Sequence, residues 1–185
     1  MERGARVLVL SGVLLVALGT MTPPAHAKLY RTREAALRNV FGAAARLEAR
    51  TVWLTAAQVD SVRHVARAPF DAPRLTYYAA SRGDTLLGYA FLDTHPVRTM
   101  SETLLIAVDP AGRVLAAEIL AFHEPEDYLP PPRWLQTLLG RRLSPHLRPG
   151  DQVDGISGAT LSARAATEAV RRALGLHHVL HGKGP

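Results

Sequence analysis

The sequence of 185 residues contains no cysteine. This absence excludes disulfides, thiolate metal sites, cysteine-ligated iron–sulfur clusters and a lipidated N-terminal cysteine. Dense tracts of lysine and arginine with interleaved aromatic residues are also missing, although the formal net charge is +6. The sequence therefore does not indicate binding to nucleic acid. Its scattered basic residues instead suit an acidic redox partner or anionic lipid headgroups.

The motifs of common catalytic sites are absent as well. The sequence has no G-x-S-x-G elbow, no H-E-x-x-H zinc motif and no clear Ser/His/Asp set, so no catalytic residue is predicted. No metal site is predicted, because the polar residues of 123–127 are loosely spaced. His177, His178 and His181 are expected to belong to a frayed C-terminal tail. Glu102 is interpreted as an ordinary surface charge.

The sequence has one long apolar run, from Val7 to Leu18, which is twelve residues. It is too short to span a bilayer, because a spanning helix needs about 20 residues. Arg3 and Arg6 flank the start of this run and Ala25-His26-Ala27 follows it, as in a secretory signal peptide. We therefore predict a signal peptide over 1–27, cleaved after Ala27, and one periplasmic domain over 28–185. The alternative is an N-terminal membrane anchor that is not cleaved.

The remaining sequence alternates between helical and strand-like patterns. Thr32 and Thr55 are candidate N-caps, the second in a capping box with Gln58. Helices are predicted over 33–45, after Thr55 and over 163–174, with a short amphipathic helix at Trp134. Strands are predicted over 52–54, 75–80, 85–93, 103–108 and 114–122. Two helices, a run of antiparallel strands and two further helices indicate an α+β fold.

The most informative segment is Asp154-Gly155-Ile156-Ser157-Gly158-Ala159-Thr160-Leu161-Ser162, directly before the last predicted helix. Its small residues let a bulky ligand approach the backbone, and a helix N-terminus offers unpaired N–H groups and a positive dipole end. A phosphate suits this position, and the Thr160 hydroxyl can hydrogen-bond to it or be esterified by it. An ordinary helix cap and turn is the alternative interpretation of the same residues.

This segment resembles the D-x-x-S-G-A-T motif of the FMN-binding domain family. That family includes flavin-carrying components of the sodium-translocating NADH:quinone reductase and of the Rnf complex. The segments 122–128 and 134–141 are also similar to parts of that family. The resemblance implies a curved antiparallel sheet with packed helices. It also implies that Thr160 carries FMN through a phosphodiester bond, which a separate flavin transferase makes from FAD.

The resemblance further implies roles for the neighbours of Thr160. The phosphate would be held by Ser157 and by the backbone from Gly158 to Leu161, where Gly158 gives clearance, Ala159 keeps the loop narrow and Ser162 adds a hydroxyl. Asp154 would be recognised by the flavin transferase or would order the loop. Glu124 would lie beside the flavin, against its ring or against the motif loop. Tyr128 and Trp134 are candidates for stacking on the ring, with ordinary packing as the alternative.

These implications describe an exported electron-transfer flavoprotein that is more suited to carrying electrons than to turning over a substrate. Its expected partners are the flavin transferase and redox proteins, which include membrane-bound ones. Two alternatives have the same fold: a module that binds a phosphate or a flavin without a covalent bond, and a small periplasmic flavin reductase.

Overall fold

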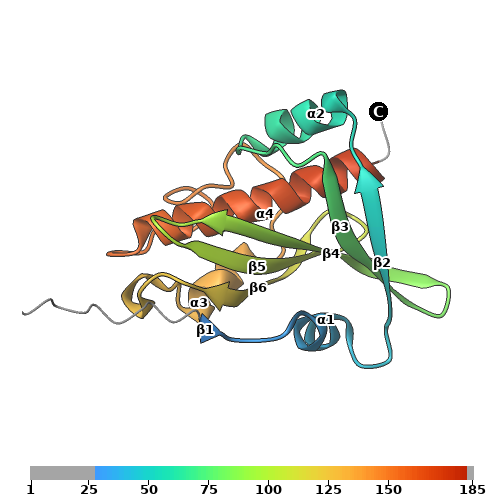
Figure 1. Ribbon diagram of the computed structural model, residues 1–185, viewed down its shortest axis with the longest axis horizontal. Coiled ribbons are helices and arrows are strands. Elements are labelled where there is room, and N and C mark those ends of the chain that lie inside the picture. Colours follow the sequence, from blue (N-terminus) through green and yellow to red (C-terminus); the bar gives the residue numbers. More distant parts are fainter. Residues whose placement is uncertain (1–27, 183–185) are drawn as a thin grey trace, which may run out of the picture.

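The computed structural model describes residues 28–182 (Figure 1). The predicted signal peptide over 1–27 lies outside these residues. The strands are β1 (Lys28–Leu29), β2 (Arg46–Trp53), β3 (Arg74–Arg82), β4 (Thr85–Pro96), β5 (Ser101–Val108) and β6 (Val114–Phe122). The α-helices are α1 (Arg33–Phe41), α2 (Ala56–Ala66), α3 (Pro132–Leu135) and α4 (Thr160–His181), and 3₁₀ turns cover Glu126–Tyr128 and Gln136–Leu138.

The six strands form one antiparallel sheet in the order β1-β6-β5-β4-β3-β2. The strands from β2 to β6 pair in sequence order, and the short β1 pairs with β6 at one edge. Helix α4 crosses one face of the sheet with α2 packed beyond it, and α1 lies on the opposite face (Figure 1). This arrangement confirms the predicted α+β fold with an antiparallel sheet and packed helices.

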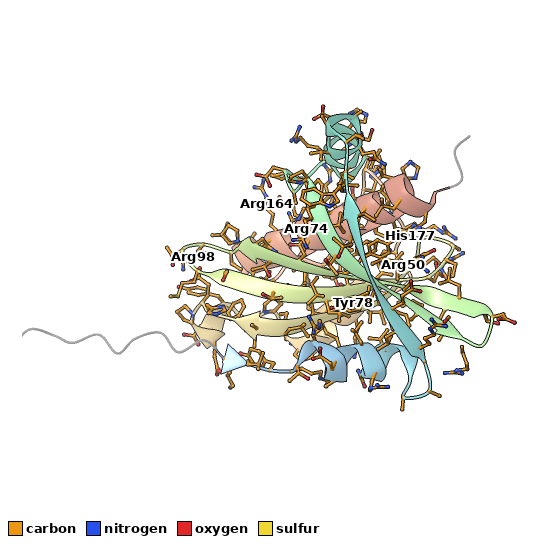
Figure 2. The ribbon with its side chains drawn as sticks, turned by 45° about the vertical axis from the view of Figure 1, so that its right-hand side comes forward. Arg50, Arg74, Tyr78, Arg98, Arg164 and His177 are labelled. Atoms are coloured by element: carbon orange, nitrogen blue, oxygen red, sulfur yellow. The ribbon has the colours of Figure 1, made fainter. Side chains whose placement is uncertain are left out.

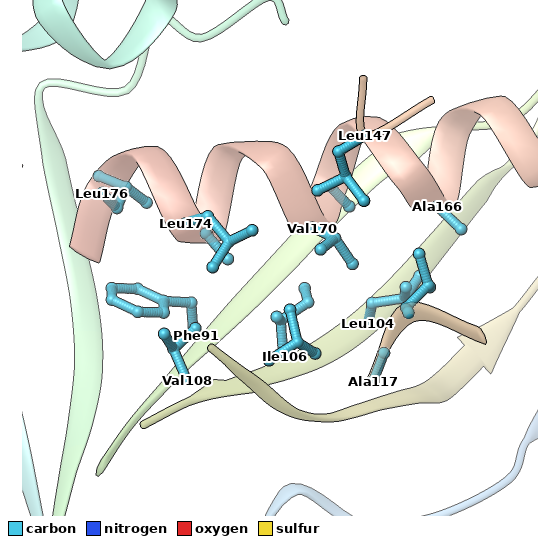
Figure 3. Packing of buried hydrophobic residues seen from close by; sticks show 14 of the residues in the cluster. Phe91, Leu104, Ile106, Val108, Ala117, Leu147, Ala166, Val170, Leu174 and Leu176 are labelled. Carbon is cyan, nitrogen blue, oxygen red and sulfur yellow. The ribbon is translucent and has the colours of Figure 1, made fainter. Parts of the chain in front are cut away.

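Strand β5 lies at the centre of the hydrophobic core because both of its faces are covered. Leu104, Ile106 and Val108 point towards α4 and pack against its apolar side (Figure 3). The intervening residues Leu105 and Ala107 belong to a second cluster beneath α1. The alternation follows from the two-residue period of a strand, and it explains why β5 is continuously apolar from Leu104 to Val108.

The first two helices begin where the sequence predicts. The Thr32 side chain accepts a hydrogen bond from the N–H of Ala35 at 3.2 Å, and Thr55 forms the predicted capping box with Gln58. Helix α1 ends at Phe41, earlier than the predicted residue 45. Gly42 follows with φ of +87°, a conformation that favours glycine and stops the helix.

Strand β2 is much longer than the predicted segment 52–54. It begins at Arg46 and pairs with β3 along its whole length. Most of its side chains are exposed, and it forms the outer edge of the sheet. Its charged residues therefore do not produce the alternation of apolar and polar positions from which a strand is predicted.

Helix α4 is also longer than predicted, with 22 residues where the sequence indicates 163–174. The prediction of a frayed tail for the C-terminal histidines is wrong for His177 and His181. His177 is buried, and the His181 ring stacks on Tyr89 with centroids 3.8 Å apart. These aromatic contacts hold the last turns of α4 against the sheet. Within residues 28–182, no helix is both long and apolar enough to cross a membrane.

Candidate functional site

The segment from Asp154 to Ser162 forms the loop that leads into α4. A turn at Ser157 and Gly158 precedes Ala159, which occupies the N-cap position, and Thr160 is the first helical residue. Gly158 has φ of +80°, and a Cβ atom added there would meet nothing within 4 Å. The loop therefore needs glycine for its backbone conformation, and the space beside it is open.

The N-terminus of α4 is not capped by a side chain. Among residues 28–182, no acceptor is hydrogen-bonded to the backbone N–H groups of Thr160, Leu161 and Ser162. Helices α1 and α2, in contrast, are capped by threonine side chains. Of the ordinary interpretation of the motif as a cap and a turn, the described residues form the turn but no side-chain cap. Three free N–H groups at the positive end of a long helix form an arrangement that favours an anion.

The side chains of the first turn of α4 differ in exposure. Thr160 is exposed, and its Oγ1 donates to the carbonyl of Ile156 at 3.3 Å, which leaves the oxygen lone pairs available. Leu161 is 51% exposed, which is high for a leucine beside an apolar core. The Ser162 hydroxyl is buried and has no hydrogen-bond partner within the described residues. The turn thus offers an exposed hydroxyl, an exposed apolar side chain and an unsatisfied buried hydroxyl.

Trp134 fixes the start of the motif loop. Its indole Nε1 donates to the carbonyl of Asp154 at 2.7 Å, and the side chain is 4% exposed. The ring therefore packs in the core, and of the two roles considered for Trp134 the structure shows packing. Asp154 itself is exposed, so its carboxylate is accessible from solvent.

The carboxylate of Glu124 binds the turn between β4 and β5. Its carboxylate accepts hydrogen bonds from the backbone N–H groups of Arg98, Thr99 and Met100 at 3.0, 2.7 and 2.8 Å. Burial alone would raise the pKa of Glu124, but these backbone hydrogen bonds outweigh it and lower the pKa. Glu124 therefore holds the β4–β5 turn, and none of its hydrogen bonds reaches the motif loop.

The β4–β5 turn and the start of α4 nevertheless lie at the same end of the molecule (Figure 1). Arg98 extends from that turn (Figure 2), and its guanidinium lies 4.6 Å from the centre of the Tyr128 ring. This cation–π contact covers one face of the Tyr128 ring, and stacking of Tyr128 on a flavin stays a prediction.

A groove of about 430 Å³ opens beside Thr160. Thr160, Arg164, Glu168 and Arg171 line it from α4, at the spacing of a single helix face. The other lining residues come from the end of α2, the segment 145–149 and α4: Arg67, Pro145, Leu147, Arg148, Pro149 and Thr167. Figure 2 shows Arg164 beside the first half of α4. Sequence analysis did not identify these arginines, although the spacing of 160, 164, 168 and 171 predicts a shared face.

A second group of charged residues lies largely buried on the α4 side of the sheet. Arg172 forms two hydrogen bonds of 2.7 Å to Asp93, and the His95 ring bridges Asp93 and Glu102 at 2.8 Å each. Glu102 is fully buried, so its interpretation as a surface charge is wrong. Its partner His95 lies directly opposite on β4, which supplies the counter-charge that burial requires.

The charges in this network control one another's protonation. Burial opposes ionisation of Asp93, but the hydrogen bonds from Arg172 and His95 outweigh it and lower the pKa of Asp93 to about 2. Burial also opposes protonation of His95, but Asp93 and Glu102 outweigh it and raise the pKa of His95 to about 9. At neutral pH the network therefore holds an ionised Asp93 between the positive charges of Arg172 and His95.

The residues around Thr160 suit both the phosphate and the ring system of FMN. The free N–H groups of α4 and the exposed Thr160 hydroxyl suit a phosphate. The groove has the volume of a ligand site, with apolar walls from Pro145 and Leu147 and several arginines. No group of three or more residues suited to a metal ion is found within residues 28–182.

Comparison with known proteins agrees with this chemistry. The family model of the FMN-binding domain matches residues 101–175, which include the motif and most of α4. The fold is similar to the crystal structure of Shewanella oneidensis NqrC, with a TM-score of 0.53 and 16% identity over 75% of this chain and 82% of that chain. Among curated proteins, none matches the sequence. The match to the family model and the shared fold confirm the resemblance of this chain to the FMN-binding domain family, with residues 101–175 as the matched part.

Proposed function

We propose that this protein is an exported electron-transfer domain that carries FMN on Thr160 through a phosphodiester bond. The observation that carries the proposal is the N-terminus of α4, where an exposed threonine hydroxyl adjoins three unpaired N–H groups in a matched FMN-binding domain. FMN supplies the electron chemistry, and the protein supplies attachment, orientation and charge. A covalent bond keeps the cofactor on a protein that works outside the cytoplasm.

A flavin transferase would make this bond from FAD. The Thr160 oxygen attacks the phosphorus of the FMN half, so that a new P–O bond forms as the P–O bond to AMP breaks. AMP leaves with that electron pair, and the proton of the hydroxyl is released. The N–H groups at the start of α4 stabilise the negative charge on the phosphate, because the positive end of the helix dipole faces it.

The neighbouring residues shape the loop for this attachment. Gly158 leaves open space for the phosphate, Ala159 adds little bulk, and Ser157 is exposed beside them. The backbone N–H of Ser162, which is unpaired in the described part of the chain, is available to the phosphate, whereas its hydroxyl is enclosed by protein. Exposed Leu161 covers part of the attached group, and the exposed Asp154 carboxylate is available to the flavin transferase.

The assignment of Thr160 is tested by Thr160→Ala in a cell that also produces the flavin transferase. We expect flavin fluorescence on a denaturing gel for the wild-type chain and none for Thr160→Ala. The fold should be retained within about 0.5 kcal/mol, because the side chain is exposed and adds little packing. Thr160→Ser keeps a hydroxyl and is expected to retain partial labelling. Full fluorescence in Thr160→Ala would contradict the assignment, and an unlabelled wild-type chain would support a non-covalent binding module.

The partners we propose are the flavin transferase and redox proteins of a membrane-associated chain of electron carriers. The similarity of fold to NqrC and the positive net charge support this, because a basic surface attracts acidic proteins and anionic headgroups. Turnover of a small substrate by the purified flavoprotein alone would favour the flavin reductase instead.

Export is tested separately from the flavin. We expect N-terminal sequencing to find Lys28 as the first residue of the mature protein, and fractionation to recover it from the periplasm. Any peripheral attachment to the membrane should be released by salt, since exposed charges are screened. A chain that retains Met1 and needs detergent for extraction would show that the segment 1–27 is an anchor.

A further inference from the structure

Arg171 is a buried arginine without an acidic partner in the described residues. Only 5% of the residue is exposed, and the guanidinium donates to three backbone carbonyls, those of Ala66, Ser144 and Leu147. No carboxylate within residues 28–182 forms an ion pair with it. Its neighbour Arg172, in contrast, is paired through two hydrogen bonds with Asp93.

Other positive charges near Arg171 add to its need for a counter-charge. Burial lowers the pKa of Arg171, the positive charges of Arg67 and Arg148 lower it further, and only Glu168 opposes them. Glu168 is itself bound to Arg164, whose Nε lies 2.9 Å from its carboxylate. A buried charge normally has a counter-charge, so the groove favours an additional anion.

Backbone strain is found at the same groove. Arg67, which ends α2 and lines the groove, has φ of +49° and is the one non-glycine residue with positive φ in the described part of the chain. Such a conformation is unfavourable for a side chain with a Cβ atom, and it recurs at ligand sites. The strain and the excess of positive charge therefore occur at one place.

The position of Arg171 along α4 limits what the anion can be. Arg171 follows Thr160 by eleven residues on the same face, a rise of about 16 Å at 1.5 Å per residue. Long side chains in helices lean back towards the N-terminus, so the guanidinium lies part of the way towards Thr160. It is nonetheless too far along the helix to share a phosphate that the first N–H groups of α4 hold.

We propose that Arg171 is the counter-charge for the isoalloxazine ring of the flavin attached to Thr160, and that it stabilises the reduced ring. The proposal rests on the proposed function, because the ring is joined to the phosphate by the ribityl chain and enters the groove from Thr160. Two-electron reduction with uptake of one proton leaves one negative charge on the ring, and Arg171 binds that charge. Arg171 thus acts directly on the flavin ring and tunes its potential.

The main experiment measures the midpoint potential of the flavin-labelled protein by spectroelectrochemistry. We expect Arg171→Gln to lower the potential by about 30 mV, which corresponds to a tenfold loss in preference for the reduced form of a two-electron couple. Arg164→Gln is the matched control, because it removes the same charge from the same groove at a side chain that is 72% exposed. Its shift should be clearly smaller, since solvent screens an exposed charge. Equal shifts in the two variants would overturn the proposal.

A second experiment does not depend on the covalent bond. The chain produced without the flavin transferase is titrated with riboflavin, which has no phosphate, in its oxidised form and after reduction with dithionite. We expect the wild-type chain to bind reduced riboflavin about tenfold more tightly, the effect of one hydrogen bond to a charged group. Equal affinity for the two forms would overturn the proposal even if Arg171→Gln does not fold. Binding of AMP or inorganic phosphate that depends on Arg171, without this preference, would show a phosphate site instead.

Failure of the proposed function gives a different result. If Thr160 carries no flavin, the denaturing gel shows it directly, and the riboflavin titration still tests the groove. If Thr160 is labelled but the potential does not depend on Arg171, the attachment stands and the tuning role is wrong.

Discussion

Neighbouring residues of α4 occupy different environments because successive positions of a helix point about 100° apart. Arg172 points towards β4 and forms an ion pair with Asp93, whereas Arg171 points towards the groove and bonds only to carbonyls. The two residues are adjacent arginines, but only Arg172 is paired with a carboxylate. A charge-removing substitution is therefore expected to leave an unpaired carboxylate at Arg172, and to leave unpaired backbone carbonyls at Arg171.

Gly158 is the glycine of the motif whose conformation an ordinary side chain resists. Its φ is +80°, and Gly140 outside the motif has a similar φ of +73° with equally open surroundings. We expect Gly158→Val and Gly140→Val each to lower the free energy of unfolding by about 1–3 kcal/mol, because a β-branched residue is strained at positive φ. Only Gly158→Val should also block flavinylation, since its side chain would occupy the space proposed for the phosphate.

Urea unfolding gives the first quantity, and flavin fluorescence after denaturation gives the second. Gly140→Val serves as the matched control for conformational strain. If both variants lose the flavin equally, general destabilisation is the cause. If Gly158→Val is labelled like the wild type, the open space beside Gly158 has no part in the attachment.

At the scale of elements, the sequence predicts the start of α4 and misses its C-terminal extension. The small residues before the helix indicate a ligand site at its N-terminus, and the spacing of Thr160, Arg164, Glu168 and Arg171 places them on one face. The C-terminal extension was missed because histidines near a chain end resemble a polar tail. Tertiary contacts, such as the stacking of His181 on Tyr89, decide that helix boundary.

Other elements were predictable to the extent that their signals are local. The caps at Thr32 and Thr55 depend on side chains within a few residues, and both were predicted correctly. Strand β2 was mostly missed because its pairing with β3 determines it rather than an apolar face. Arg67 and Arg148 were missed as groove residues, because α2 and the segment before the motif approach Thr160 only in the folded chain.

At the scale of the whole molecule, buried ionisable groups connect the sheet to α4 at two places. Asp93, His95 and Glu102 on β4 and β5 meet Arg172 in the middle of α4. His177 and His181 pack on the sheet near the C-terminal end of α4, where burial lowers the pKa of both. The first group is stable when His95 is charged, whereas the second is stable when the histidines are neutral. The two groups therefore respond to pH in opposite directions.

We expect the free energy of unfolding to be greatest near pH 6.5 and to fall on both sides. Burial and the charges of His177 and Arg50 lower the pKa of His181 from 6.5 to about 4, so the unfolded chain binds more protons in that interval. Stability present above pH 6.5 is then lost as the pH falls towards 4. The pKa of His95 is raised from 6.5 to about 9, so the folded chain binds the extra proton there. Stability present below pH 6.5 is lost as the pH rises through 9.

Variants at His95 and His181 separate the two limbs of this profile when urea unfolding is followed between pH 4 and about 9. His95→Gln should remove the loss on the alkaline side, and it should also lower stability at pH 6.5 because Glu102 then lacks its positive partner. His181→Gln should reduce the loss of stability on the acid side without abolishing it, since His177 continues to titrate there. Asp93 contributes only at the acid end of this range, because its pKa is 3.8 in the unfolded chain and Arg172 and His95 hold it at about 2 in the folded chain against the effect of burial. A wild-type profile that rises steadily from pH 6.5 to 9 would show that His95 is not held in its charged form. The network of hydrogen bonds that joins Arg172 to Glu102 would then need another source of positive charge.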